Sequence, residues 1–430
     1  MQLIVCCDGT WNDPDDGTHI HRICQAGRAA LPDAENVYYG KGVGLEPGMR
    51  LSGAALGKGL SENVRDAYRW LVRHHADGAE IYIFGFSRGA YTARSLTGLM
   101  NYAGLLQPQD EGSIKDAYAA YRFRQHERVR TRFHHGAAHG RSRQVRIRFL
   151  GVFDTVGALG LPLDWVKRIT ADLPHLNLQF HDTRLCGNVD VACQALAIDE
   201  RRGPYEPTWW EAPAPGAALP EKILQVWFPG VHSDVGGGYA DDKSLAEVAL
   251  GWMLEQAREA GLDFAPGLPM WPFTGDPGGT LHDSFSLRWR FAHLLPSVDP
   301  YVRPIGSAQR DARALAPVPG EKLHWSALAR IERGGYAPAQ LVSRGALRQL
   351  DLPMFRGRAE ARVREGRPTI IDRGAPVTLL DRSASGARIR IEGPLPLLPQ
   401  VRLHVDDAQQ DYEVRWRRGR ELGLRRLASR

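Results

Sequence analysis

The segment 81–90, IYIFGFSRGA, constrains the fold of this chain more than any other stretch. Its apolar first half predicts a buried strand, and apolar side chains recur at helical spacing from residue 88 to residue 102. Only a tight turn around Ser87 separates the strand from the helix. This layout is typical of a nucleophile elbow, in which a serine lies exposed at the carboxyl end of a strand in an α/β sheet.

Two glycines flank this serine and give the interpretation a steric basis. Gly85 and Gly89 surround a residue held in strained backbone geometry, where larger side chains would collide with the neighbouring strand and helix. The helix that follows points backbone N–H groups at the place where an oxyanion would form. The segment therefore predicts a serine hydrolase with Ser87 as nucleophile, although the pattern G-x-S-x-G also occurs by chance in unrelated proteins.

The 430 residues are enough for a large core and predict two domains. Strand-like and helix-like segments alternate over residues 1–240, which predicts an α/β-hydrolase-like fold with a mostly parallel sheet and helices on both faces. We expect strands at 2–7, 81–84, 145–153 and 223–228, and helices at 61–75, 88–102 and 244–260. Ser61 is a candidate N-cap, and Ser244 with Glu247 forms a candidate capping box.

The segment from residue 356 to the end differs in charge and in pattern. It holds 17 arginines, no lysine and 10 acidic residues, a net charge of +7, whereas the preceding 355 residues carry a net charge of −1. Short strand-like runs at 377–380, 387–391, 401–405 and 412–416 predict a small β-barrel. We therefore expect an α/β-hydrolase domain over 1–345 and a β domain over 356–430 with an anionic partner.

A serine nucleophile needs a base and an orienting acid. In α/β hydrolases the chain order is serine, acid, histidine, each just past a strand. Asp154 follows the strand predicted at 145–153, and His232 follows the one at 223–228. Because the carboxyl ends of parallel strands surround one crevice, we expect both to meet Ser87 there. Asp199 and Asp234 compete for the role of the acid, and each residue can also be explained as an ordinary loop residue.

An oxyanion hole needs two backbone donors, and the residue after the nucleophile supplies one of them. That donor is the N–H group of Arg88. The loop after the first strand is the candidate for the second, because Gly9 permits close backbone approach and Thr10 adds a hydroxyl. The same loop is also compatible with a simple Asx-type turn.

The five cysteines have no metal-ligand spacing and predict buried free thiols in a reducing compartment. No apolar run is long enough for a transmembrane helix, and residues 1–8 predict a first strand and not a signal peptide. We expect a cytoplasmic protein that needs no metal or catalytic cofactor.

Four segments together resemble the DUF2235 α/β hydrolases, a family that includes the catalytic domain of Tle1-type phospholipase effectors of type VI secretion. They are 7–12 (CDGTWN), 85–90 (GFSRGA), 151–157 (GVFDTVG) and 229–239 (PGVHSDVGGGY). Two further blocks, 38–44 (YYGKGVG) and 195–202 (ALAIDERR), extend the resemblance over about residues 1–345. It implies a lipid-ester or carboxylic-ester substrate and a Ser87–His232 pair with an aspartate, foremost Asp154.

The C-terminal segment resembles the PilZ domain, a bacterial receptor for cyclic di-GMP. The PilZ patterns R-x-x-x-R and D/N-x-S-x-x-G match Arg358 with Arg362, and Asp381 with Ser383 and Gly386. The resemblance implies that these five residues bind the nucleotide. Two guanidinium groups can grip phosphates and stack on guanine, and a short polar turn can contact base edges. The alternative is a basic β module that docks on the hydrolase or binds a membrane surface.

Two functions from different classes follow from these patterns. The first is a serine esterase or lipase, phospholipase-like, that acts on an ester or lipid and is regulated by cyclic di-GMP. The second is a catalytically inactive hydrolase-fold scaffold that serves as a cyclic di-GMP receptor and acts through a protein partner. Neither involves a nucleic acid polymer. The acyl chain, the head group and the oligomeric state do not follow from the sequence.

Overall fold

The computed structural model describes residues 1–9, 16–42, 53–106, 111–122, 142–157, 185–211, 220–263, 275–286, 300–311, 313, 315, 318–343, 346–347, 354–355, 363–371, 375–382, 386–391, 400–405, 408–418 and 421–426. The chain divides into two compact units. The first comprises Met1–Leu268 and Gly275–Met354, and the second comprises Pro269–Thr274 and Phe355–Arg430.

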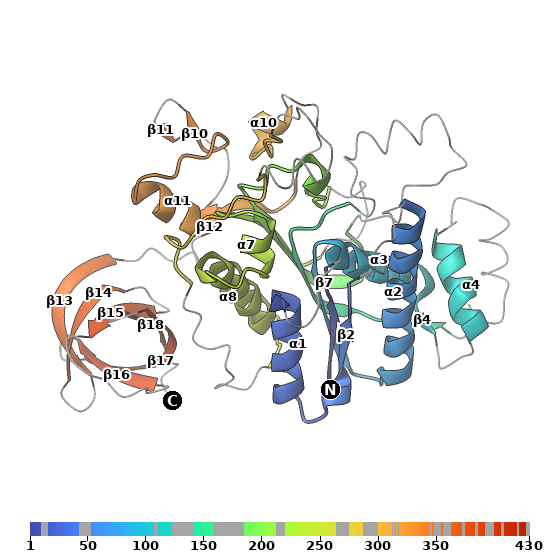
Figure 1. Cartoon of the computed structure of the whole chain (residues 1–430). Coiled ribbons are helices and arrows are strands. Elements are labelled where there is room, and N and C mark those ends of the chain that lie inside the picture. The colour runs from blue at the N-terminus through green and yellow to red at the C-terminus, as the bar shows by residue number, and fades with distance from the viewer. Residues whose placement is uncertain are drawn as a thin grey trace. The chain divides into compact units, whose positions relative to one another are not determined.

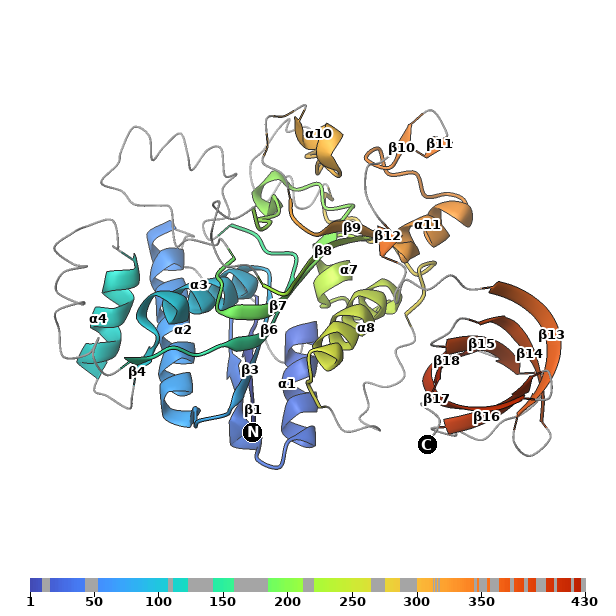
Figure 2. The same cartoon turned by 180° about the vertical axis from the view of Figure 1, so that it is seen from behind.

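The first unit is built on a sheet of eight strands in the order β12-β9-β8-β7-β6-β3-β1-β2 (Figures 1 and 2). Parallel pairs join seven of them, from β2 to β9. The strands are β1 Gln2–Cys7, β2 Val37–Gly40, β3 Glu80–Phe86, β6 Ile147–Phe153, β7 Val189–Ala197, β8 Lys222–Phe228, β9 Glu321–His324 and β12 Met354–Phe355. The prediction of an α/β fold with a mostly parallel sheet is confirmed.

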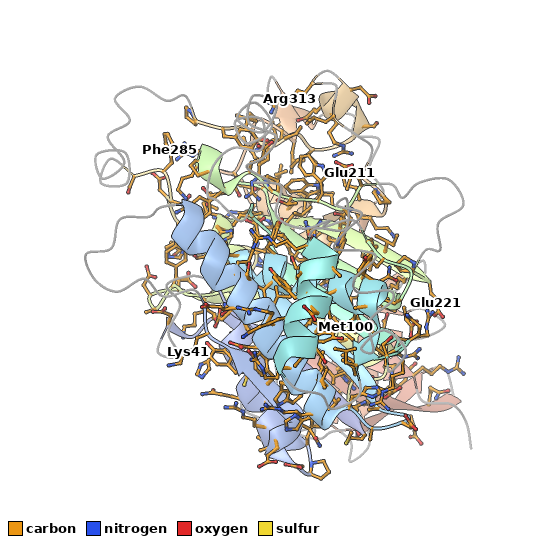
Figure 3. The ribbon with its side chains drawn as sticks, turned by 90° about the vertical axis from the view of Figure 1, so that its right-hand side faces the viewer. Lys41, Met100, Glu211, Glu221, Phe285 and Arg313 are labelled. Carbon is orange, nitrogen blue, oxygen red and sulfur yellow. The ribbon has the colours of Figure 1, made fainter. Side chains whose placement is uncertain are left out.

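Helices cover both faces of this sheet, with α2, α3 and α4 on one face and α1 and α8 on the other (Figures 1 and 2). Figure 3 views the first of these faces with its side chains. The helices are α1 His19–Ala30, α2 Gly53–His74, α3 Arg88–Ala103, α4 Glu111–Arg122, α7 His232–Gly236, α8 Ser244–Glu259, α10 Ser307–Asp311 and α11 Trp325–Glu332. The short elements are η2 Ala34–Asn36, β4 Leu105–Leu106, β5 Ser142–Arg143, η4 Gly203–Tyr205, β10 Val342–Ser343 and β11 Ala346–Leu347. Within the described ranges, no helix combines the length and the apolar character that crossing a bilayer requires.

The two-faced burial explains the continuous apolar sequence of β1. Successive side chains of a strand point to opposite faces. Leu3, Val5 and Cys7 belong to the core that α2, α3 and α4 close, whereas Ile4 and Cys6 lie against α1. A strand covered by helices on both faces has no solvent side and therefore shows no alternation of polar and apolar residues. None of the five cysteines forms a disulfide, and Cys6, Cys7, Cys24 and Cys193 are buried, as predicted, whereas Cys186 is partly buried.

The strand order places the carboxyl ends of β1 and β3 at the point where the chain reverses its direction across the sheet. β1 pairs with β2 on one side and with β3 on the other. In open α/β sheets, ligands bind in the crevice outside the carboxyl ends of the strands at such a switch point. Ser87 follows β3 and Asp8 follows β1, so the topology directs attention to these two loops.

Two local predictions about helix ends are wrong. Helix α2 begins at Gly53, so Ser61 lies inside the helix and does not cap it. Helix α8 does begin at Ser244, but its N-cap residue is Lys243, whose side chain makes no capping hydrogen bond. Glu247 instead forms an ion pair of 2.6 Å with Arg22 on α1. A tertiary partner therefore takes the carboxylate that the local pattern assigned to the capping box.

The second unit is an antiparallel β structure, as predicted. Its strands pair in the order β13-β14-β15-β18-β17-β16, and β13 also pairs with β16, which closes the barrel. The strands are β13 Val363–Ile371, β14 Ala375–Arg382, β15 Gly386–Ile391, β16 Gln400–Val405, β17 Ala408–Arg418 and β18 Glu421–Arg426. Ala387, Ile389, Tyr412, Leu422 and Leu424 are buried within it.

Candidate active site

Ser87 occupies the turn between β3 and α3 with a backbone that non-glycine residues rarely adopt. Its φ is 57° and its ψ is −122°. Its N–H group donates a hydrogen bond of 3.0 Å to the carbonyl of Phe153, which ties the turn to the end of β6. Strained non-glycine residues persist only where their surroundings fix them, and they cluster at functional sites.

The two flanking glycines allow this turn to pack. A Cβ atom on Gly85 would lie 2.6 Å from Cα of Ala90 in the following helix. A Cβ atom on Gly89 would lie 2.2 Å from the carbonyl oxygen of Cys7 and 2.4 Å from that of Asp8. Both contacts are with main-chain atoms, which cannot move aside as a flexible side chain can. The close approach of helix α3 to β1 and β3 therefore requires glycine at both positions.

Asp154 follows β6 directly and is fully buried, with a φ of 40°. Its Oδ2 lies 2.6 Å from His232 Nδ1. Its Oδ1 accepts hydrogen bonds from the N–H of Ala197 at 3.0 Å and from Arg303 Nη1 at 2.6 Å. Arg303 Nη2 donates to Oδ2 at 3.0 Å, so the guanidinium grips both carboxylate oxygens.

The environment of Asp154 keeps its carboxylate ionised. Burial by itself would raise the pKa of Asp154, but the charge of Arg303 and the hydrogen bonds from His232 and Arg303 outweigh it. The pKa of Asp154 is consequently held well below its ordinary value. An ionised carboxylate only accepts hydrogen bonds, so Nδ1 of His232 carries the proton that it donates to Asp154.

His232 is the first residue of α7, just past β8, and it is 3% exposed. Its Nε2 lies 2.8 Å from Ser87 Oγ. Burial lowers the pKa of the His232 imidazole, and the bond to Asp154 offsets this only in part. The neutral imidazole, protonated at Nδ1, therefore presents the lone pair of Nε2 to the hydroxyl of Ser87. The structure thus brings Ser87, His232 and Asp154 together in one hydrogen-bonded series.

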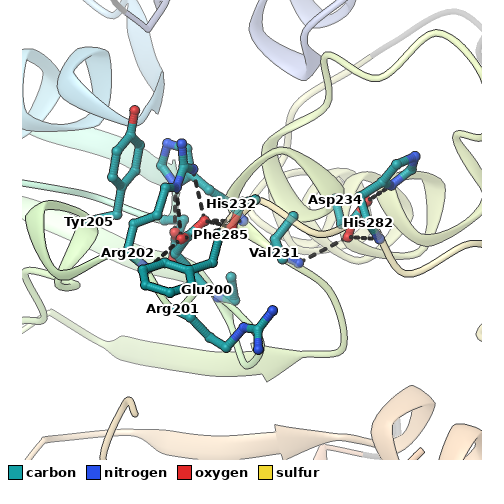
Figure 4. A network of polar contacts seen from close by, with 12 residues as sticks. Glu200, Arg201, Arg202, Tyr205, Val231, His232, Asp234, His282 and Phe285 are labelled. Carbon is teal, nitrogen blue, oxygen red and sulfur yellow. Dashed lines mark hydrogen bonds and ion pairs between the residues drawn. The ribbon is translucent and has the colours of Figure 1, made fainter. Parts of the chain in front are cut away.

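The two competing aspartates lie elsewhere. Asp199 accepts hydrogen bonds from the N–H of Gly230 at 2.7 Å and from the hydroxyl of Tyr336 at 2.8 Å, and burial raises its pKa to about 6. Asp234 accepts from the N–H of Val231 at 3.0 Å and pairs with His282 at 2.5 Å (Figure 4). In this structure neither carboxylate bonds to the ring of His232, although both brace the loop before it.

Glu200 supports the main chain of His232 (Figure 4). This fully buried carboxylate accepts two bonds from the Arg202 guanidinium, at 2.9 and 2.8 Å, and one from the Ser284 hydroxyl at 2.9 Å. It also accepts from the N–H of His232 at 3.3 Å. Burial raises the pKa of Glu200, but Arg202 outweighs this and the pKa is lowered. The ring of Tyr205 contacts two of these groups: the Arg202 guanidinium lies 3.6 Å from its centroid, and the centroid of the His232 imidazole lies 5.0 Å away.

Of the three residues predicted for an oxyanion hole, only two are described. The N–H of Arg88, the first residue of α3, makes no hydrogen bond within the described part of the chain. The N–H of Gly9 donates to Asp8 Oδ1 at 2.8 Å and is therefore occupied. The Asp8 carboxylate is further held by the hydroxyls of Thr18 and Tyr39. The alternative of an Asx-type turn requires a bond from the N–H two residues on, that of Thr10. Thr10 lies outside the described residues.

The residues predicted to bind a nucleotide are only partly described. Asp381 lies in β14 and Gly386 begins β15, while Arg358, Arg362 and Ser383 lie outside the described residues. No group of three or more His, Cys, Asp or Glu side chains that could hold a metal ion occurs within the described ranges.

Sequence reasoning missed Arg303. It lies 149 residues after Asp154, in a stretch without strand or helix, and nothing in the motif Val302-Arg303-Pro304 marks it. Its guanidinium also donates to the carbonyls of Ala197 at 2.8 Å and Tyr205 at 2.6 Å, so one side chain joins three segments. The one available signal was the expected burial of Asp154, because a buried carboxylate needs a cationic partner.

We expect Gly89→Ala to lower the free energy of unfolding by about 3 kcal/mol, because the added methyl group meets main-chain oxygens of β1. Gly203→Ala is the matched control, since nothing lies within 4 Å of a Cβ atom there. Urea unfolding followed by circular dichroism measures both. Equal stability of the two variants would contradict the close packing of α3 on β1.

We expect Arg303→Met to lower the free energy of unfolding at pH 7 by about 3–5 kcal/mol, because it leaves the buried carboxylate of Asp154 without its opposite charge. Removing this positive charge also raises the pKa of His232, which burial holds below its ordinary value in the native protein. Urea unfolding and NMR titration of the histidine ring protons measure the two effects.

Arg201→Met is the control for this substitution, because the Arg201–Asp283 pair is exposed and contributes less than about 1 kcal/mol. Arg303→Lys keeps the charge and loses the two-pronged grip, so its effect falls between those of the control and Arg303→Met. An unshifted His232 titration in Arg303→Met would contradict the electrostatic role of Arg303.

Comparison with known proteins places the chain in a family. Residues 1–256 match the family described as "T6SS, Phospholipase effector Tle1-like, catalytic domain". The uncharacterized protein YEL023C of Saccharomyces cerevisiae is 22% identical over 407 residues, which covers 62% of this chain and 58% of the yeast protein.

Two solved structures are similar in part. A crystal structure of an uncharacterized protein from Pseudomonas aeruginosa has a TM-score of 0.37 and 18% identity, over 61% of this chain and 46% of that one. A structure of the Tle1 effector bound to the VgrG spike of the type 6 secretion system has a TM-score of 0.28 and 18% identity. The match covers 55% of this chain and 51% of the chain in that structure. The chain therefore spans about half the length of the relatives it matches. Because the family match covers more than half of its residues, the chain belongs to the Tle1-like phospholipase effector catalytic-domain family.

Proposed function

We propose that this chain is a serine hydrolase that cleaves carboxylic esters of lipids, as a lipase or phospholipase. The observation that carries the proposal is the hydrogen-bonded series from Ser87 Oγ through His232 to Asp154. A serine on a strained strand-to-helix turn, with a buried histidine and acid at neighbouring strand ends, suits acyl transfer. Membership of the Tle1-like family supports a lipid substrate.

In the proposed mechanism Ser87 Oγ attacks the ester carbonyl while its proton passes to His232 Nε2. The new C–O bond turns the carbonyl oxygen into an oxyanion. When the tetrahedral intermediate collapses, the bond to the leaving alcohol breaks and His232 returns the proton to that alcohol. Water then attacks the acyl-serine with His232 again as base, which releases the fatty acid. Asp154 holds the imidazole by Nδ1 and stabilises its protonated form.

We assign the N–H of Arg88 to the oxyanion hole, because a free N–H at the first turn of a helix favours a developing negative charge. Gly9 and Thr10 stay in the proposal as the source of the second donor. For Gly9 to serve, its N–H must leave the carboxylate of Asp8, to which it now donates. Removing one such donor typically costs about 10²–10³ in kcat.

We further propose that the C-terminal unit is PilZ-like and that cyclic di-GMP, bound there, regulates the hydrolase. The two sequence motifs and the antiparallel β structure support this. Asp381 pairs with Arg388 in the ladder of β14 and β15, so Asp381 and Gly386 flank the short connection between these strands. Arg358 and Arg362 would supply the two guanidiniums for the phosphates.

The second candidate function is an inactive hydrolase-fold scaffold that receives cyclic di-GMP and acts through a protein partner. One observation favours it: the N–H of Gly9 is bonded to Asp8 and is not available to an oxyanion. The family's description as type VI secretion effectors is the ground for proposing export by that system, from a cytoplasm in which the chain is made. Contact with a membrane surface follows from the proposed lipid substrate.

We expect the chain to hydrolyse p-nitrophenyl butyrate and at least one phospholipid of a panel, and to be labelled at Ser87 by a fluorophosphonate. Ser87→Ala abolishes turnover and labelling with little change in stability. Ser95→Ala on the same helix is the control, since its buried hydroxyl has no hydrogen-bond partner in the described part of the chain and leaves both unchanged. Absence of turnover and of labelling in the native protein would favour the scaffold.

We expect cyclic di-GMP to bind the full chain in a calorimetric titration and to change the rate of ester hydrolysis. Arg358→Ala with Arg362→Ala weakens binding by at least about 100-fold, because each lost charge-assisted bond is worth about 1.5–3 kcal/mol. Arg390→Ala with Arg426→Ala removes the same charge from exposed positions outside the motifs and is the control. Equal affinity of the two double variants would overturn the nucleotide site.

A further inference from the structure

The side chain of Arg88 is the feature of the site that the proposed mechanism leaves unused. It is partly buried, and within the described part of the chain its guanidinium has neither a hydrogen bond nor an ion pair. Burial lowers the pKa of Arg88, and the nearby Tyr205 raises it. Withdrawing a charged guanidinium even partly from water costs free energy unless a partner offsets it. An arginine at this position is therefore expected to have a function.

Other arginines of the first unit show what is unusual about Arg88. Arg202, Arg303 and Arg310 each face a carboxylate, that of Glu200, Asp154 and Glu321. The buried Arg94 donates instead to the main-chain carbonyls of Thr208 and Trp209. The fold therefore gives each of these guanidiniums a hydrogen-bonded partner. Arg88 has neither a carboxylate partner nor a hydrogen bond of its guanidinium in the described ranges, and its side chain is only partly buried. Its charge is therefore available to a ligand.

Tyr205 is a second donor beside the same place. Its ring meets the imidazole of His232 edge-on, with the ring centroids 5.0 Å apart. Its hydroxyl has no hydrogen bond to the described part of the chain, and Figure 4 shows the side chain extending away from the Glu200 carboxylate. Arg88 neighbours Ser87 in the chain and Tyr205 in space. As far as the described residues show, a cation and a hydroxyl without hydrogen-bond partners therefore border the atoms proposed to attack the ester.

We propose that Arg88, with the hydroxyl of Tyr205, binds the phosphate of the substrate, so that the preferred substrate is an ester with a phosphate close to the scissile bond. This inference rests on the proposed hydrolase function and deepens it. A guanidinium offers several N–H donors in a planar fork and binds phosphate oxygens in pairs. The glycerol backbone of a phospholipid places a phosphodiester only a few bonds from each acyl ester, which suits donors that adjoin the nucleophile.

The pairing of the other two guanidiniums near the site favours this assignment. Arg202 and Arg303 are hydrogen-bonded to the carboxylates of Glu200 and Asp154, so each pair is electrically neutral. Of Arg88, Arg202 and Arg303, Arg88 is thus the one whose guanidinium makes no hydrogen bond in the described part of the chain.

The test compares two monomeric substrates with the same acyl chains, dioctanoyl-phosphatidylmethanol and dioctanoylglycerol, which differ only in the methyl phosphodiester. The quantity measured is the ratio of their kcat/KM values. We expect Arg88→Met to lower this ratio by about 10- to 100-fold, chiefly through KM for the phospholipid, because charge-assisted bonds are lost. Arg88→Lys keeps the charge and loses the fork, so its ratio falls less.

Arg28→Met is the matched control, because Arg28 is exposed on α1 and its loss changes the net charge by the same amount. We expect its ratio to equal that of the native protein. If Arg88→Met lowers both kcat/KM values equally, the residue is structural and the proposal is overturned. An unchanged ratio overturns it as well. Arg88→Lys decides the matter should Arg88→Met not fold.

A separate measurement distinguishes this proposal from the proposed function. Should the native protein hydrolyse neither substrate, the hydrolase function fails, and the phosphate site is judged by calorimetry with glycerol 3-phosphate. Binding to Ser87→Ala that disappears in Ser87→Ala with Arg88→Met supports the site. No binding to Ser87→Ala overturns it.

Discussion

The carboxylate of Asp154 is buried at the carboxyl end of β6, and the surrounding structure is arranged to keep it charged. Burying an ion costs several kcal/mol unless opposite charge and hydrogen bonds offset it. Arg303 supplies the charge, Ala197 supplies an N–H group, and His232 completes the set. The family match ends at residue 256, whereas Arg303 lies beyond it. A residue outside the match thus neutralises the buried carboxylate of Asp154.

Backbone strain gathers at the same place. Ser87 and Asp154 are the two non-glycine residues with positive φ in the described part of the chain, and their side chains meet the same imidazole. Such conformations cost of order 1–3 kcal/mol each and persist only where the surroundings enforce them. For Ser87 the surroundings are Gly85 and Gly89, which let α3 pack against two strands. The strain sets the direction of the hydroxyl before any ligand arrives.

A second layer of carboxylates holds the histidine. Glu200 accepts from the N–H of His232, and Asp234 fixes the turn before it through the N–H of Val231. Glu200 is paired with Arg202 and Asp234 with His282, so each of these carboxylates has a partner within the fold. Arg88 stands apart because its guanidinium is not part of any such pair in the described ranges. That contrast between satisfied and unsatisfied charge is the physical basis for inferring a ligand.

Local sequence patterns were enough to predict the strand–turn–helix around Ser87, the parallel α/β order and the antiparallel character of the last segment. These features depend on apolar periodicity and on the steric demands of Gly85 and Gly89, which act over a few residues. Which aspartate faces His232 followed only from the folded chain, because strand register and burial distinguish acidic residues whose local sequences look alike. The tertiary structure also revealed Arg303, whose partner is 149 residues away, and it gave Glu247 to Arg22 in place of a helix cap. Contacts of this kind arise from packing between distant segments, and no local pattern encodes them.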